Sequence, residues 1–258
     1  MKVAAFQFKG SGNITANLLA IKRGIAKASE QNVRVLITQE CALCGYPPIE
    51  TEKANQIDFH QLARAQEQIA QLAIQHQMVI ALGTIIPGPG ACLNSVALIS
   101  PGHEKYPSYH KRALWGWDHE NFTPGHEQGV YTIDHVKLGF RICYEVRFPE
   151  YFRELFREEV EIACVSFCDV EKEPNPTRYE LIKSHLMTRA VENAMFVISV
   201  NSISGYQTAP TCLISPDGEV LETAPLDEEY LLAFDYEKPG SNFGRDGRIQ
   251  HSNELLGI

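Results

Sequence analysis

Three residues of types that act together in nucleophilic catalysis lie at the ends of apolar segments or in a long loop between them. Glu40 follows the apolar run 33–38, Cys143 follows the run 136–142, and Lys111 lies in a long polar stretch between them. A thiol attacks a carbonyl carbon, a carboxylate removes the thiol proton, and an ammonium stabilises the oxyanion that forms. Each residue taken alone is more often structural. The complete set predicts Glu40, Lys111 and Cys143 as a catalytic group.

The segments that must position these residues alternate between strand-like and helix-like patterns. Apolar residues at helical spacing predict one-sided helices after Asn13, after Asp58 and around 179–186, with a further helix from about Pro149. Runs rich in Val, Ile, Leu and Phe predict buried strands at 3–8, 33–38, 78–86, 94–100, 136–142, 161–167, 195–201, 211–215 and 231–236.

These elements indicate a mixed α/β fold. Strands that alternate with helices are typical of parallel crossovers, whereas the runs 78–86 and 94–100, joined through Pro-Gly-Pro-Gly, predict a hairpin. The carboxyl ends of strands in such folds converge on one crevice. The polar stretches 41–56 and 102–129 are long for simple connections and are therefore expected to carry functional residues.

The composition limits the class of protein. The chain has 258 residues, of which 44% are apolar, and this is typical of a globular protein. Its 23 basic and 32 acidic residues give a net charge of −9, which disfavours binding to nucleic acid or to an anionic membrane. No apolar stretch approaches the ~20 residues of a membrane span, and the opening MKVAAFQFKG lacks the pattern of a signal peptide. We therefore expect a cytoplasmic protein with one domain over residues 1–258.

The cysteines leave a second kind of chemistry open. There are seven, and most lie in or beside apolar runs, which favours reduced, buried thiols over a secreted disulfide framework. Cys41 with Cys44, and Cys164 with Cys168, form two close pairs that raise zinc binding or thiol redox chemistry as an alternative. The second pair lies in a strand-like run, whose rise of ~3.3 Å per residue separates its members. We therefore expect no metal.

Three segments of the chain resemble the signature regions of the nitrilase, or carbon–nitrogen hydrolase, superfamily. They are Glu40 followed by Gly45-Tyr46-Pro47-Pro48, then Tyr109-His110-Lys111, and then Cys-Tyr-Glu-x-Arg-Phe-Pro-Glu from Cys143 to Glu150. Supporting segments at 3–7, 121–125, 189–193 and 215–218 follow the order of the family, so the resemblance extends along nearly the whole chain. The third region is most similar to the amidase branches, because Trp often follows the nucleophile in true nitrilases.

The resemblance implies a four-layer αββα sandwich of two mixed β-sheets, which is commonly paired as a homodimer. It makes Glu40 the general base, Lys111 the oxyanion stabiliser and Cys143 the nucleophile. A second carboxylate often joins this site. We favour Glu120, although the longer spacing common in the family points to Asp118. A non-catalytic scaffold is disfavoured because all three reactive residues are present.

The activity implied is hydrolysis of a small linear amide, as in ω-amidases, through a thioester on Cys143 with release of ammonia. The backbone N–H of Tyr144 is a candidate second donor to the oxyanion. No metal or organic cofactor is required. Trp115, Trp117 and Arg147 are candidates for the substrate pocket; the alternatives are core or dimer contacts for the two Trp residues and a loop-structuring role for Arg147. Hydrolysis of an N-carbamoyl amide or of a nitrile is the alternative activity.

Overall fold

The computed structural model describes residues 1–258 except 89 and 103–105, and its strands form two large mixed sheets. The first sheet has the order β14-β1-β2-β3-β4-β5, with bounds β14 (Tyr230–Asp235), β1 (Lys2–Gln7), β2 (Val35–Thr38), β3 (Val79–Ile86), β4 (Leu93–Ile99) and β5 (Tyr109–His110). The second has the order β13-β12-β10-β8-β7-β6, with bounds β13 (Val220–Thr223), β12 (Cys212–Ile214), β10 (Phe196–Val200), β8 (Ile162–Ser166), β7 (Val136–Ile142) and β6 (Val130–Ile133). The short strands β9 (Val170–Glu171) and β11 (Tyr206–Gln207) pair separately.

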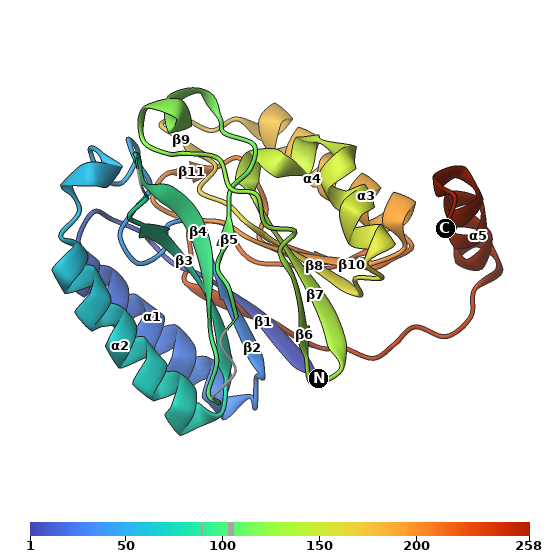
Figure 1. Cartoon of the computed structure of the whole chain (residues 1–258), viewed down its shortest axis with the longest axis horizontal. Coiled ribbons are helices and arrows are strands. Elements are labelled where there is room, and N and C mark those ends of the chain that lie inside the picture. The colour runs from blue at the N-terminus through green and yellow to red at the C-terminus, as the bar shows by residue number, and fades with distance from the viewer. Residues whose placement is uncertain (89, 103–105) are drawn as a thin grey trace.

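Helices cover the outer face of each sheet, which produces four layers (Figure 1). The helices α1 (Ile14–Glu30) and α2 (Phe59–His76) lie beside the first sheet, and α3 (Pro149–Arg157) and α4 (Pro176–Asn193) lie beside the second. Separate apolar clusters fill the three interfaces; they include Phe6 and Ile21, then Ile37 and Phe140 between the sheets, then Phe152 and Leu186. This arrangement confirms the expected αββα sandwich.

The helices begin where the sequence predicts them. The Asn13 side chain accepts a hydrogen bond from the Ala16 N–H, and Asp58 caps α2 in the same way. In α1 the buried residues Ile14, Ile21 and Ile25 recur at helical spacing and face the first sheet. The one-sided pattern therefore determines how this helix packs.

The strand pairing aligns several carboxyl ends. Strands β1, β2 and β3 run parallel, as do β7, β8 and β10. The predicted hairpin is confirmed, since β3 and β4 are antiparallel in the register Ile80↔Ile99. The residues that follow β2, β7 and β8 meet at the region where the two sheets adjoin: the Glu40 N–H donates to the Phe167 carbonyl across that boundary. This hydrogen bond between the two sheets fixes the position of the backbone at Glu40.

The polar stretches contain short 3₁₀ helices and one strand. η1 (Ala54–Gln56) lies in the first of them, and β5 and η2 (Gly116–Glu120) lie in the second, while η3 (Cys143–Arg147) connects β7 to α3. The last helix, α5 (Phe243–Leu256), follows an extended segment and lies at one end of the molecule, where its Arg248 donates to the Val191 carbonyl of α4 (Figure 1). Among the described residues, none of the helices is long and apolar enough to cross a membrane.

Candidate active site

A buried lysine contacts two carboxylates at the centre of the candidate site. The Nζ of Lys111 lies 2.8 Å from Oε1 of Glu40 and 2.7 Å from Oδ2 of Asp118, and all three side chains are fully buried. Lys111 directly follows β5, and its N–H donates to the Asn94 carbonyl, which fixes the start of its loop on β4. Glu40 follows β2 by two residues. The structure therefore brings together two of the three predicted catalytic residues in direct contact.

Donors surround the Glu40 carboxylate. Its Oε1 also accepts from Nδ2 of Asn94 at 2.7 Å, and its Oε2 accepts from the Cys168 N–H at 2.9 Å. Burial raises the pKa of Glu40, and the lowering effect of Lys111 does not cancel this rise. Glu40 is thus held in one orientation while its affinity for a proton stays above that of an exposed glutamate.

Lys111 remains charged in this setting. Burial alone would lower its pKa, but its acidic neighbours, with Glu40 the strongest, raise the pKa well above its ordinary value. When Glu40 and Asp118 are both ionised, the three side chains Lys111, Glu40 and Asp118 together carry one net negative charge.

Cys143 is the first residue of η3 and lies at a sharp turn between β7 and α3. Its backbone has a φ of 46°, a left-handed conformation that non-glycine residues rarely adopt. Its side chain is partly accessible, unlike the six other cysteines, which are buried. Burial in its surroundings, followed by the charge of Glu40, raises the pKa of the Cys143 thiol well above its ordinary value, against the opposing effect of Lys111. The thiol therefore carries its proton in the resting site.

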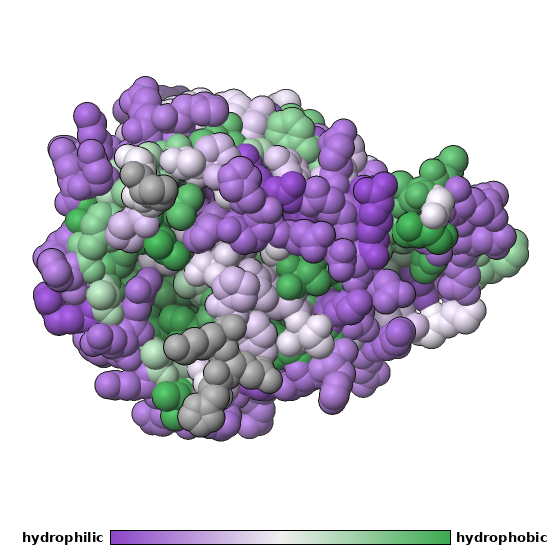
Figure 2. Space-filling view, viewed as in Figure 1, coloured by the Kyte–Doolittle hydropathy of each residue, from purple (hydrophilic) through white to green (hydrophobic). Residues whose placement is uncertain are grey.

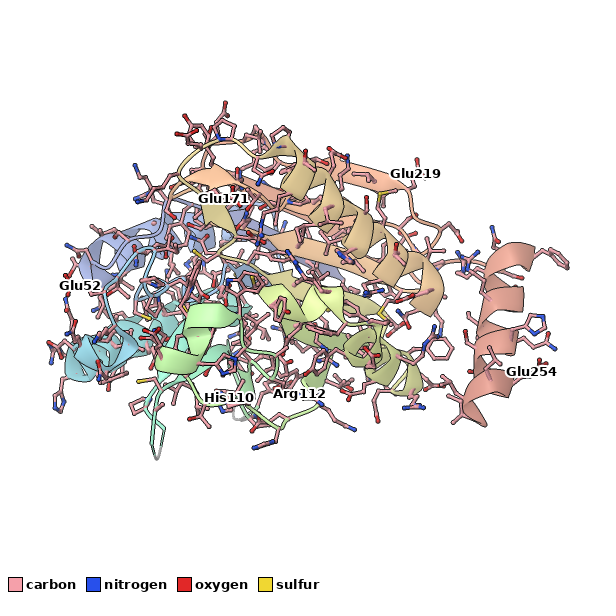
Figure 3. The ribbon with its side chains drawn as sticks, turned by 90° about the horizontal axis from the view of Figure 1, so that it is seen from above. Glu52, His110, Arg112, Glu171, Glu219 and Glu254 are labelled. Carbon is pink, nitrogen blue, oxygen red and sulfur yellow. The ribbon has the colours of Figure 1, made fainter. Side chains whose placement is uncertain are left out.

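Glu145 connects the turn of Cys143 with the loop of Lys111. This fully buried carboxylate accepts hydrogen bonds from the Ile142 N–H at 2.6 Å and from the Arg112 N–H at 2.7 Å. The hydroxyl of Tyr109 lies 2.8 Å from both of its oxygens. Sequence reasoning did not assign Glu145 a role, although its position two residues after Cys143 was a signal. Figure 3 shows Arg112 and His110, which flank Lys111, on this loop.

The structure corrects the choice of the second carboxylate. Asp118 is fully buried and contacts Lys111, whereas Glu120 is exposed at the end of η2. A 3₁₀ helix has three residues per turn, so side chains two positions apart point in different directions. Asp118 is further held by the Tyr46 hydroxyl, which donates at 2.6 Å, and by the Trp115 N–H at 2.8 Å.

A small cavity opens beside Cys143. Its volume is about 200 Å³, and it is lined by the predicted pocket residues Trp115, Trp117 and Arg147 and by Tyr144, the candidate backbone donor. The Arg147 guanidinium lies 5.6 Å from the ring centre of Trp115 and 5.7 Å from that of Tyr144. Tyr144 is the second residue of η3, and N–H groups in the first turn of a helix have no acceptor inside it. The cavity thus combines aromatic walls with polar donors.

An ion pair that the sequence did not reveal also lines this cavity. The Nε of Arg178 donates to Asp169 at 3.0 Å, and a second guanidinium nitrogen donates to the same carboxylate at 3.1 Å. Thr208 also donates to Asp169, at 2.6 Å. Among the described residues, Arg147 has no such carboxylate partner, so it is the guanidinium that remains available to a ligand.

The cysteine pairs do not form a metal centre in the described part of the chain. Cys164 lies between the sheets, whereas Cys168 packs in the cluster beneath α1 and α2. Burial raises the pKa of Cys44 to about 12 and that of Cys41 well above its ordinary value, so both thiols are protonated. Within the described residues, no group of three or more His, Cys, Asp or Glu residues is placed to hold a metal ion.

The four-layer fold is shared with solved amidase structures. The structure of an amidase from Nesterenkonia sp. superimposes with a TM-score of 0.82 at 23% sequence identity, covering 100% of this chain and 95% of the other. The chain belongs to the carbon–nitrogen hydrolase family, whose model matches residues 2–236.

The relatives with named activities include two amidases. A deaminated glutathione amidase from Synechocystis sp. is 29% identical over 222 residues, which cover 76% of this chain and 75% of the relative. A 2-oxoglutaramate amidase from Bacillus subtilis is 26% identical over 239 residues, which cover 90% and 89% of the two chains. These comparisons agree with the amidase-like assignment that the motifs indicate.

Proposed function

We propose that this protein hydrolyses small linear amides through a thioester on Cys143, with Glu40 as the general base and Lys111 as the oxyanion stabiliser. The observation that carries the proposal is the buried contact of Lys111 with Glu40 and Asp118, next to the accessible Cys143 thiol. Such a group supplies a nucleophile, a proton acceptor and a positive charge without further components.

The first half of the reaction forms the thioester. Glu40 removes the proton from Cys143 as its sulfur bonds to the amide carbon, because a free thiolate would add a second net negative charge to the site. The ammonium of Lys111 and the N–H of Tyr144 bind the oxyanion. The tetrahedral intermediate then collapses, Glu40 gives its proton to the nitrogen, and ammonia leaves.

The second half regenerates the enzyme. Glu40 removes a proton from water as the water oxygen attacks the thioester carbon. Collapse of this intermediate breaks the carbon–sulfur bond and releases the carboxylic acid, while Glu40 returns the proton to Cys143. Asp118 keeps the Lys111 ammonium in place through both halves, since its carboxylate is itself held by Tyr46.

The leaving nitrogen must face Glu40, and this favours primary amides. Glu40, Asn94 and Lys111 are at most 1% exposed, so the nitrogen side of the site is closed. A substituent on that nitrogen has no room, whereas the acyl chain lies toward the open cavity. Ammonia release therefore fits the site better than release of a larger amine.

The position of Arg147 favours a substrate whose acyl chain carries a hydrogen-bond acceptor, as in ω-amides of dicarboxylic acids. Its guanidinium lines the cavity, is oriented by two aromatic rings and has no carboxylate partner among the described residues. We expect Arg147→Met to lower kcat/KM for succinamate about tenfold and to leave butyramide nearly unchanged, because one charge-assisted hydrogen bond contributes ~1.5 kcal/mol or more.

The proposed chemistry is tested by mass spectrometry. Wild-type protein quenched during turnover of a primary amide should carry the acyl group on Cys143, and Cys143→Ala should carry none and release no ammonia. Full turnover by Cys143→Ala would refute the thioester route. Ammonia release from N-carbamoyl amino acids or nitriles alone would instead support the alternative activities.

We also propose a homodimer. The helix α5 and its ends expose Phe243, Leu255 and Ile258, of which Phe243 is 97% exposed. Figure 2 shows apolar side chains at the α5 end of the molecule. Exposed apolar surface of this kind is typical of an interface. Sedimentation of an active monomer at micromolar concentration would contradict the proposal.

A further inference from the structure

A second, larger cavity adjoins the one beside Cys143. Its volume is about 850 Å³, compared with about 200 Å³ for the smaller cavity. Both cavities are lined by Ile49, Trp117, Val170 and Glu171. These shared residues make the two cavities direct neighbours, and we call the larger one the outer groove. Figure 3 shows Glu171, one of these shared residues, on the strand β9.

The walls of the outer groove are held by hydrogen bonds. Glu50 accepts from the Tyr46 N–H at 3.0 Å and from the Ser202 hydroxyl at 2.6 Å, which connects the loop of Ile49 with the loop before β11. On the other side β11 pairs with β9 in the register Tyr206↔Glu171. The groove is thus built by fixed elements on both sides.

The lining of the outer groove is apolar with two unpaired positive charges. Ile49, Trp117 and Tyr206 are 42%, 39% and 47% exposed, and together they form an apolar surface in the groove. Lys9 and Lys172 also line the groove, and within the described residues neither is in an ion pair.

The two acidic residues of the groove, Glu171 and Asp227, equal its two lysines in number. Within the described residues neither carboxylate forms an ion pair with Lys9 or Lys172, and Glu171 instead lies 3.7 Å from Nε of Arg178, a guanidinium that is also paired with Asp169. The groove therefore offers an apolar surface, with two ammonium groups at hand for a carboxylate, to whatever leaves the smaller cavity past Trp117.

We propose that the outer groove binds the distal part of an extended acyl chain, an apolar or aromatic segment that ends in a carboxylate. The inference rests on the proposed function, because the closed nitrogen side directs the acyl chain away from Glu40 and toward the groove. The substrate class is then a primary amide at one end of a peptide-like chain, with a carbonyl near Arg147, an aromatic group against Trp117 and Tyr206, and a carboxylate near Lys172.

Two primary amides test this proposal: glutaramate, which fills only the inner cavity, and glutaramyl-phenylalanine, which carries an aromatic ring and a distal carboxylate. Tyr206→Ala and Lys172→Glu should each lower kcat/KM for glutaramyl-phenylalanine about 5-fold, as expected for the loss of ~1 kcal/mol. Turnover of glutaramate should stay within twofold. Leu221→Ala is the matched control, since Leu221 is also 47% exposed but lines neither cavity.

A binding measurement separates the two proposals. In the Cys143→Ala background, Tyr206→Ala should weaken the Kd for glutaramyl-phenylalanine by a similar factor and leave the Kd for glutaramate unchanged. An equal response of both amides, or no response to either groove variant, overturns the groove proposal. If the groove variants weaken binding but wild-type protein hydrolyses neither amide, the groove is supported and the proposed function fails.

Discussion

The Asp118 carboxylate lies 2.7 Å from the Lys111 ammonium, and neither side chain reaches solvent. Lys111 thus has two acidic partners: Asp118, which Tyr46 and Trp115 hold in place, and Glu40, the proposed general base. Without Asp118, the Lys111 ammonium would pair with Glu40 alone, and this stronger pairing would hinder the proposed proton transfer to Glu40. This relationship underlies the first two predictions.

Asp118→Asn should lower kcat about 10²-fold with little change in KM, because the ammonium loses the charge that positions it against the oxyanion. Initial rates of ammonia release provide the measurement. Glu120→Gln, a change at the exposed neighbour, should leave kcat unchanged. Equal losses in the two variants would contradict the assignment of Asp118.

The acid limb of the pH dependence of kcat/KM should lie above the ordinary pKa of a glutamate, about 4.3. Burial raises the pKa of Glu40, and the protonated carboxyl cannot accept the thiol proton, so activity falls as the pH decreases through that value. The charge of Asp118 contributes to the rise, so Asp118→Asn should shift the limb to lower pH. A shift to higher pH would show that the limb belongs to another group.

Glu145→Gln should lower the free energy of unfolding by about 2 kcal/mol, because an amide nitrogen replaces one buried acceptor oxygen and leaves backbone N–H groups without a partner. Tyr109→Phe removes only one donor to the same carboxylate and should cost about 1 kcal/mol. Urea unfolding measures both values. If Tyr109→Phe proves the more destabilising change, Glu145 does not connect the two segments as described.

Gly83→Ala should reduce both stability and activity. An added Cβ at Gly83 would lie 1.8 Å from the Gln39 carbonyl oxygen, so the backbone next to Glu40 must move. Overpacking of this kind costs about 1–3 kcal/mol. Gly240→Ala, where an added Cβ meets no atom within 4 Å, is the control. Thermal unfolding and ammonia release measure the two effects, and unchanged activity in Gly83→Ala would show that the segment tolerates the shift.

Local patterns in the sequence determined the elements of this protein and the neighbourhood of its candidate site. The apolar runs predicted β2 and β7, the caps Asn13 and Asp58 predicted the starts of α1 and α2, and the hairpin of β3 and β4 followed from its turn. Such features depend on interactions within a few residues. The sequence motifs also pointed to Glu40 and Cys143, which follow β2 and β7, and to Lys111 in the long polar stretch.

Only the tertiary structure decided which side chains touch. The preference for Glu120 over Asp118 depended on spacing, whereas the direction of each side chain is set by the turn of η2 and by the position of Tyr46, 72 residues away from Asp118. The Cys168 N–H that holds Glu40 comes from 128 residues further along the chain, in the segment that follows β8 of the other sheet. Contacts between residues so far apart in the chain arise because the two sheets pack against each other. The periodicity of a sequence predicts single helices and strands, but not how those elements pack.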